Sequence, residues 1–134
     1  AQLWALLRAF EKFSPKRYWD VTAWRVGYAH AAGEIQTCTR EQAFEWLKQD
    51  AEQYIKAVEL QARDISNNGW VALCSLCFNI GVGAFTGSTL LEKVRAGDRS
   101  GAAKEFDRWI HSKGKVLEGL VERRAVERDL FLGK

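Results

Sequence analysis

At 134 residues the chain fits one domain, long enough to bury a core without disulfide or metal staples. Its hydrophobic share of 47% and charged share of 28% are those of a globular protein, and no apolar run approaches the ~20 residues that span a bilayer. The net charge of +3 comes from 20 basic and 17 acidic residues that mostly alternate on predicted helices, which excludes the basic stripe of a nucleic-acid-binding protein. The first residues show no basic stretch before an apolar segment, so we expect any export signal to be absent or already removed.

The first predicted element is a helix that ends near Glu11. Leu3, Leu7 and Phe10 recur at the three- and four-residue spacings of one helix face. Pro15 disfavours the α conformation in the residue before it, so we expect Glu11 at or just past the helix C-terminus. The negative end of the helix dipole favours the uncharged acid form of a carboxyl group there.

A short β region is predicted from Lys16 to about Ile35, because aromatic and β-branched residues gather there between glycines. Asp20 lies in this region, and we expect it to be more solvated than Glu11. Two carboxyl groups in contrasting environments are typical of the acid and base that cleave a glycosidic bond.

A capping box at Thr39–Gln42 predicts the start of a long helix that continues to about Leu60. Asn67–Gly69 is predicted to be a turn, and the almost wholly apolar segment Trp70–Phe78 a central buried helix. Further along, the sequence predicts a tight reversal at Gly81, Gly83 and Gly87, a helix capped by Ser88 or Thr89 and ended by Gly97-Asp98, an amphipathic segment from Ala102 to Ile110, a loop bounded by Gly114 and Gly119, and a last helix from Leu120 to Phe131.

These elements predict an α+β fold that is mostly α. We expect a single domain over residues 1–134. Its antiparallel β lobe spans about 14–36, and the long helix joins it to a helical lobe of about 60–134 plus the N-terminal helix.

Three cysteines are an odd number and do not describe a complete disulfide framework. Cys74 and Cys77 form a C-x-x-C pair inside the apolar segment, where small core residues are favoured over a zinc or redox site. Cys38 lies in a predicted loop with no partner that the sequence identifies. We therefore expect no metal and no cofactor.

Several separated motifs occur in a familiar order: Phe10-Glu11, Tyr18-Trp19-Asp20, Gly27–His30, Ala72–Gly81, Ala84–Leu91, Gly119–Arg124, Glu127 and Leu130-Phe131. With these motifs the chain resembles phage-type lysozymes, the endolysin muramidases of glycoside hydrolase family 24, over nearly its whole length. The resemblance implies a lysozyme-like fold and hydrolysis, without a cofactor, of the β-1,4 bond between N-acetylmuramic acid and N-acetylglucosamine.

The resemblance also implies the roles of the two carboxyl groups. The helix-end Glu11 would protonate the leaving oxygen, and Asp20, nine positions on, would orient or activate water. The usual outcome in the family is inversion, which requires carboxyl groups roughly 6.5–9.5 Å apart. The implied partner is bacterial peptidoglycan, and the implied activity is bacteriolytic and antimicrobial. We expect a monomer that stays in the host cytoplasm before its release to the cell wall. We expect no binding of nucleic acid and no stable insertion into a membrane.

The sequence departs from the family pattern around the water-positioning step. Arg25 stands where the family has Thr, the loop after Asp20 is one residue shorter, and Lys12 and Ala29 replace glycines. Because guanidinium only donates hydrogen bonds, Arg25 cannot replace the hydroxyl, although its charge would favour an ionised Asp20. Thr22 on the shortened turn is the candidate for the missing hydroxyl.

Four further positions match residues that line the sugar cleft in the family: Ala31, Phe78, Ser88 and Glu105. A core role for Phe78 is equally compatible with the sequence. The resemblance also implies that Arg123 or Arg124 reaches Glu11 and that His30 is structural, and we expect Trp19 and Trp24 to be cleft residues.

Two alternative functions stay open. A peptidoglycan-binding protein would keep the cleft but lose turnover through Arg25 and Lys12. A membrane-active cationic helix would lie between Leu120 and Lys134, although its acidic residues oppose membrane binding.

Overall fold

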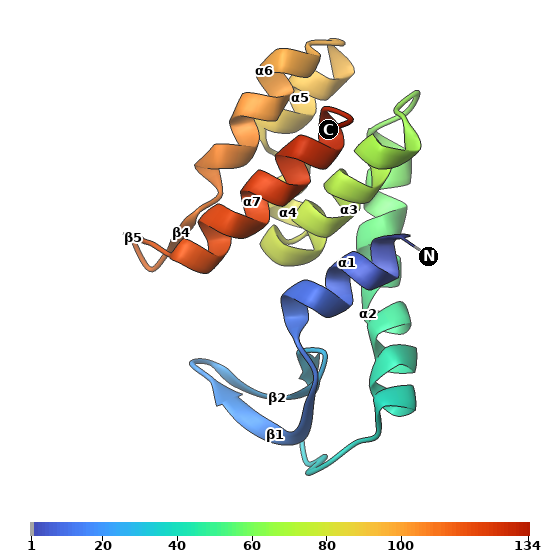
Figure 1. Cartoon of the computed structure of the whole chain (residues 1–134), viewed down its shortest axis with the longest axis vertical. Coiled ribbons are helices and arrows are strands. Elements are labelled where there is room, and N and C mark those ends of the chain that lie inside the picture. Colours follow the sequence, from blue (N-terminus) through green and yellow to red (C-terminus); the bar gives the residue numbers. More distant parts are fainter. Residues whose placement is uncertain (1) are drawn as a thin grey trace. The chain divides into compact units, whose positions relative to one another are not determined.

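The computed structural model describes residues 2–134. The structure is mostly helical (62%) with a small antiparallel sheet near the start of the chain, which confirms the predicted fold class (Figure 1). The chain divides into two compact units between Glu52 and Gln53, a boundary that falls inside the long helix α2 (Arg40–Gln61). This division groups the N-terminal helix with the sheet, and the single-domain organisation stays a prediction.

The first unit begins with helix α1 (Gln2–Glu11), which buries Leu3 and Leu7 and ends at Glu11 as predicted. The next residue, Lys12, has φ +51, the left-handed conformation that commonly terminates a helix and that glycine adopts most easily. Ala29 also has a left-handed φ of +60. Both departures from glycine therefore fall at positions where a side chain is sterically disfavoured.

Three antiparallel strands follow in the order β1 (Ser14–Asp20), β2 (Ala23–Gly27) and β3 (His30–Ala31), which confirms the predicted β region. Trp19 pairs with Trp24, and on either side of them Tyr18 pairs with Arg25 and Asp20 with Ala23. Successive side chains of a strand point to opposite faces, so Tyr18, Asp20 and Arg25 share one face of the hairpin and the two tryptophans the other.

The capping box at the start of α2 is present as predicted. The Thr39 hydroxyl accepts a hydrogen bond from the Gln42 backbone N–H at 3.1 Å, and the Gln42 side chain accepts one from the Thr39 N–H at 2.9 Å. One face of the helix is buried, at Ala43, Leu47, Ala51 and Val58.

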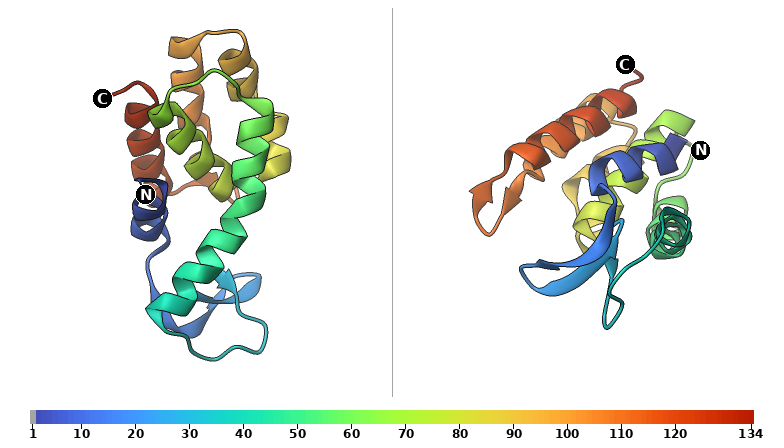
Figure 2. Two further views of the ribbon diagram at one scale, coloured as in Figure 1. Left: turned by 90° about the vertical axis from the view of Figure 1, so that its right-hand side faces the viewer. Right: turned by 60° about the horizontal axis from the view of Figure 1, so that its bottom comes forward.

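The second unit is a helical assembly. Its elements are α3 (Asn67–Ile80), α4 (Val82–Thr86), α5 (Thr89–Arg95), α6 (Arg99–Glu105), a 3-10 turn (Phe106–Arg108), the hairpin β4 (His111–Ser112) and β5 (Lys115–Val116), and α7 (Glu118–Phe131). As predicted, α3 is the central buried helix, with residues 71–77 all buried. It packs beside α7, as both sets of views show (Figures 1 and 2).

The structure corrects four local predictions. Asn67–Gly69 forms the first turn of α3, where the sequence predicts a turn before a helix that starts at Trp70. The Ser66 hydroxyl accepts a hydrogen bond from the Gly69 N–H at 3.0 Å and so caps the helix about one turn before Trp70. The glycine-rich reversal contains the short helix α4, whose Phe85 is fully buried. Gly119 lies inside α7, and Trp109 and Ile110 lie beyond the 3-10 turn, outside any helix.

A buried charged cluster joins α3 to α7. Arg124 and Glu127 have no exposed side-chain surface, and the Arg124 Nε lies 2.7 Å from the Glu127 Oε1 in an ion pair whose angle is not that of a hydrogen bond. The Ser75 hydroxyl donates to the other Glu127 oxygen at 2.5 Å. The basic residues at the centre of α7 are thus part of the core. Among residues 2–134, no helix is both long and apolar enough to cross a membrane.

Candidate active site

Glu11 and Asp20 occupy the ends of two consecutive elements of the first unit. Glu11 is the last residue of α1 and is half-buried, whereas Asp20 is the last residue of β1 and has a side chain 54% exposed. The contrast in solvation expected from the sequence is therefore present.

The charges of both carboxyl groups act on Tyr18. Burial raises the pKa of its phenol, and the negative charges of Asp20 and Glu11 raise it further, while the Arg25 charge lowers it. Both carboxyl groups therefore lie within electrostatic range of one side chain. Among the described residues the Tyr18 hydroxyl has no hydrogen-bond partner in the protein. The sequence analysis includes Tyr18 in a motif but gives it no role. Because Tyr18 precedes Asp20 by two residues on a predicted strand, the two side chains are expected on the same face, and this spacing was the signal for a shared site.

Arg25 lies beside Asp20, as its charge suggested. The Arg25 Nε is 3.5 Å from the Asp20 Oδ2, and the Arg25 side chain is 32% exposed. The pair forms because β1 and β2 place Tyr18, Asp20 and Arg25 on one face of the hairpin. The guanidinium can thus hold the Asp20 carboxylate in one orientation.

Thr22 belongs to the two-residue loop that joins β1 to β2. Its backbone N–H donates to the Asp20 carbonyl oxygen, and its side chain is exposed. Val21, the residue between them, has φ +46, a conformation that is strained for a β-branched side chain. The hydroxyl therefore lies two residues from Asp20 on a tight turn.

Ala31 is exposed on β3, next to a structural histidine. The His30 Nδ1 is 2.7 Å from the Asp50 Oδ2, and the imidazole stacks on Trp46 with ring centres 4.6 Å apart. These contacts attach β3 to α2, in agreement with the structural role expected of His30.

Ser88 and Glu105 line one cavity of about 390 Å³ in the second unit, together with Gly83, Ala84, Gly87, Thr89, Arg108 and Trp109. The Glu105 carboxylate is 13% exposed and accepts a hydrogen bond from the Arg108 Nε at 2.9 Å. The Ser88 hydroxyl caps α5, since it donates to the Phe85 carbonyl at 2.7 Å and accepts from the Leu91 N–H at 3.1 Å. Sequence reasoning missed Arg108 and assigned Trp109 to a helix face.

Phe78 is half-buried near the end of α3, with its ring edge-on to the Tyr54 ring and the two ring centres 5.3 Å apart.

Arg124 donates hydrogen bonds to acceptors within the second unit. Its Nη1 donates to the Asn79 side-chain oxygen at 2.9 Å and to the Trp109 carbonyl oxygen at 3.2 Å. Contact of Arg123 or Arg124 with Glu11 stays a prediction.

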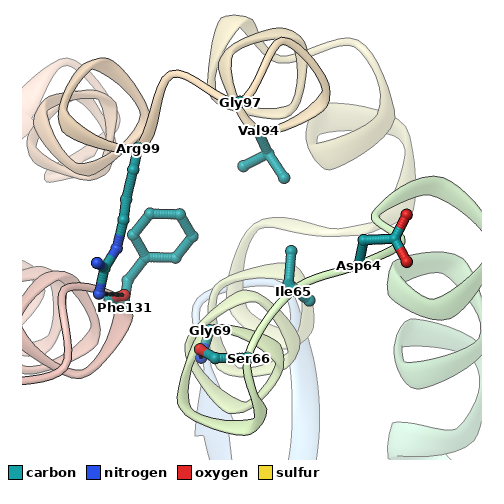
Figure 3. A pocket seen from close by; sticks show the side chains of 8 residues that line it. All are labelled: Asp64, Ile65, Ser66, Gly69, Val94, Gly97, Arg99 and Phe131. Carbon is teal, nitrogen blue, oxygen red and sulfur yellow. Dashed lines mark hydrogen bonds between the residues drawn. The ribbon is translucent and has the colours of Figure 1, made fainter.

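A second hollow of the helical unit contains none of the predicted site residues. Its volume is about 280 Å³, and Figure 3 shows Phe131 and Arg99 on one side and Val94 and Ile65 near the other. The remaining lining residues are Asp64, Ser66, Gly69 and Gly97.

The cysteines are free thiols among the described residues. Burial raises the pKa of Cys77 to about 12, and burial with the neighbouring Cys77 charge raises that of Cys74 even more, so neither is a ready thiolate ligand. Within residues 2–134, no group of three or more His, Cys, Asp or Glu side chains is arranged to hold a metal ion.

The phage lysozyme family model matches residues 8–127 of the chain. Among curated relatives, the endolysin of Acyrthosiphon pisum secondary endosymbiont phage 1 is 38% identical over 136 residues, which cover 94% of this chain and 92% of the relative. The endolysin of Bacillus phage B103 is 37% identical over 134 residues, covering 95% of this chain and 51% of the relative. The chain thus spans about half the length of its Bacillus phage relatives.

Solved structures agree with these sequence relatives. The muramidase domain of SpmX from Asticaccaulis excentricus superposes with a TM-score of 0.89 at 32% identity, covering 98% of this chain and 95% of that one. A mutant of P22 lysozyme superposes with a TM-score of 0.85 at 31% identity, covering 98% and 96%. Together with the fold and the positions of the two carboxyl groups, these matches show that the chain belongs to the phage lysozyme family.

Proposed function

We propose that the protein is a peptidoglycan muramidase that hydrolyses the β-1,4 bond between N-acetylmuramic acid and N-acetylglucosamine, acting after release from the host cytoplasm to the cell wall. The observation that carries the proposal is the pair of carboxyl groups at the ends of α1 and β1, both within electrostatic range of Tyr18, in a chain of the phage lysozyme family.

Glu11 is the proposed general acid. It is the last residue of α1 and is half-buried, so the helix end fixes where its carboxyl group lies. A protonated Glu11 donates its proton to the glycosidic oxygen as the bond to the anomeric carbon breaks.

Asp20 is the proposed water-activating group. Its carboxylate is solvent-exposed and is oriented by Arg25, so it can accept a proton from a water molecule that attacks the anomeric carbon from the opposite ring face. Thr22 is the proposed second hydrogen-bond partner of that water, in the role that the family gives to the residue replaced by Arg25. This arrangement inverts the anomeric configuration.

Ala31 in the first unit and Phe78, Ser88 and Glu105 in the second are the proposed substrate-contacting residues. The Trp109 ring in the cavity of Ser88 and Glu105 adds an apolar surface of the kind that packs on a pyranose ring, and the Glu105–Arg108 pair adds polar groups for hydroxyl and acetamido substituents.

The test is release of reducing sugar from purified sacculi by the wild type and by Glu11→Gln. Loss of a general acid should lower kcat by about 10²–10⁴-fold. Glu34→Gln, an exposed carboxyl of the same unit, is the matched control and should keep the wild-type rate. An undiminished rate for Glu11→Gln would remove Glu11 from the mechanism.

A non-catalytic peptidoglycan-binding protein is the alternative that one observation favours, namely the presence of Arg25 against Asp20 in place of a water-binding hydroxyl. It requires saturable binding to sacculi with no reducing sugar released by the wild type, even at high protein concentration. The membrane-active helix is not favoured, because the basic residues Arg123 and Arg124 are buried in the core.

A further inference from the structure

Exposed aromatic residues gather on the β1–β2 hairpin. Trp19 and Trp24 are 57% and 39% exposed, and Val21 at the loop is 58% exposed. The other large exposed apolar side chains among the described residues, apart from Tyr18, are Leu60, Val116, Leu117 and Val126 in the helical unit. Such a cluster of large apolar groups in water marks an interaction surface.

The two tryptophans lie on the hairpin face opposite Asp20 and Arg25. Trp19 and Trp24 are directly paired across the strands, whereas Asp20 and Arg25 occupy the alternate positions. The pleat therefore gives the hairpin a catalytic face and an aromatic face. Figure 2 shows the hairpin as a two-stranded ribbon whose loop end extends away from α2. The sequence leads us to expect that both tryptophans are cleft residues, and the register places them on the hairpin face opposite Asp20 and Arg25.

Arg17 completes the aromatic face. Its guanidinium lies over the Trp24 ring at 4.1 Å from the centroid, and the Trp19 and Trp24 rings are edge-on with centres 5.5 Å apart. The Arg17 Nη1 is 3.5 Å from the Gly33 carbonyl oxygen, which restrains the side chain. The result is an ordered platform with an open Trp19 ring beside a cation, so little side-chain entropy is lost when it binds.

The chemistry of this platform matches a peptide-bearing glycan strand. Pyranose rings have an apolar face that packs on an indole, and the stem peptides of peptidoglycan carry carboxylates that pair with guanidinium. An anionic lipid surface would also pair with the Arg17 guanidinium, and the vesicle experiment below distinguishes it from a glycan strand.

We propose that Trp19, Trp24 and Arg17 form a second glycan-contacting surface, separate from the catalytic face, that retains the protein on peptide-bearing strands of the wall. This inference rests on the proposed function for its ligand. It predicts that wall binding and bond cleavage are separable properties of the two faces of one hairpin.

Binding is measured by co-sedimentation of purified protein with intact sacculi, in a Glu11→Gln background so that the ligand is not consumed. Trp19→Ser with Trp24→Ser should raise the apparent Kd about tenfold or more, as truncation of exposed aromatic anchors does. Trp19→Phe with Trp24→Phe keeps the rings and should restore most of the binding. Leu60→Ser with Val116→Ser removes exposed apolar groups of the other unit and should leave the Kd unchanged.

Arg17→Gln separates the peptide contribution from the sugar contribution. It should weaken binding to intact sacculi about threefold or more, and leave binding to sacculi stripped of stem peptides by an amidase unchanged. Vesicles of phosphatidylglycerol test the lipid alternative, and we expect no binding that depends on the tryptophans.

Unchanged sacculus binding by the folded double Ser variant, or tryptophan-dependent binding to the vesicles, would overturn the proposal. Thermal melts establish that each variant is folded. If the double Ser variant is not, Trp19→Ser alone tests the same surface, because it removes the more exposed ring and keeps the Arg17–Trp24 contact, and it should also weaken binding. The proposed function fails by a different result, namely that the wild-type protein releases no reducing sugar from sacculi. The co-sedimentation assay measures binding in a variant that does not cleave, so the two failures are distinguishable.

Discussion

Two arginine–carboxylate pairs of this protein have opposite settings. Arg124 and Glu127 are fully buried between α7 and α3 at 2.7 Å, whereas Arg25 and Asp20 are half-exposed on the hairpin at 3.5 Å. Burial makes removal of one partner costly, because the other charge remains in a poorly solvating interior. Removing one partner of a solvent-exposed pair costs little stability, so such a pair can have a role in catalysis without being needed for the fold. The comparison separates residues that hold the fold from residues that act on a ligand.

The largest effect is expected in the buried pair. Glu127→Gln leaves Arg124 and Arg123 without their carboxylate and should lower the free energy of unfolding by about 3–5 kcal/mol, measured by urea denaturation. At a temperature where the variant is still folded, its kcat should stay close to that of the wild type. A decrease in the free energy of unfolding of less than about 1 kcal/mol would show that the Arg124–Glu127 pair behaves like a solvated pair. It would contradict the contrast with the Arg25–Asp20 pair.

The exposed pair should show the reverse behaviour. Arg25→Ala should change the free energy of unfolding by less than about 1 kcal/mol, while kcat falls about tenfold because Asp20 loses the group that orients it. Arg128→Ala is the matched control, because Arg128 and Asp107 form an ion pair of similar exposure at 3.0 Å in the other unit. It should have the same small effect on stability and none on kcat. Equal activity of the two variants would contradict the role of Arg25.

A smaller effect concerns buried thiols in alkaline solution. The Cys77 pKa rises from 9.0 to about 12 on folding, so the folded state keeps a proton that the unfolded chain loses. The resulting stability is complete below the unfolded pKa and is lost as the pH rises from about 9 toward 12. The free energy of unfolding should therefore fall more between pH 7 and about pH 10.5 in the wild type than in Cys74→Ala with Cys77→Ala. Equal pH dependence would show that these thiols ionise as readily in the folded state.

Local sequence signals predict the elements whose ends are fixed by nearby side chains. The reciprocal Thr39–Gln42 contacts define the start of α2, and the end of α1 at Glu11 follows from the chain entering a strand that contains Pro15. The start of α3 is misjudged because Ser66, a single capping hydroxyl, outweighs the turn tendency of Asn67–Gly69. The short helix α4 forms among glycines because Phe85 has a buried site to fill.

The candidate site is only partly accessible to sequence reasoning. Spacing and helix periodicity place Glu11 and Asp20 on consecutive elements, and the charge of Arg25 suggests its contact with Asp20. The pairing register, which the sequence does not specify, decides that Tyr18 shares a hairpin face with Asp20 and Arg25 while Trp19 lies on the opposite face. The cavity that contains Trp109 depends on the chain leaving its helix at Phe106–Arg108, a tertiary effect that periodicity does not reveal.

The anomeric configuration of the first product, followed by proton NMR during hydrolysis of a soluble peptidoglycan fragment, tests most directly the claim that Glu11 and Asp20 act on opposite sides of the scissile bond. If Asp20 directs water to the face opposite the leaving group, the newly formed reducing end appears first as the α-anomer and then mutarotates. Initial appearance of the β-anomer would mean retention through a second displacement, and would contradict the proposed role of Asp20.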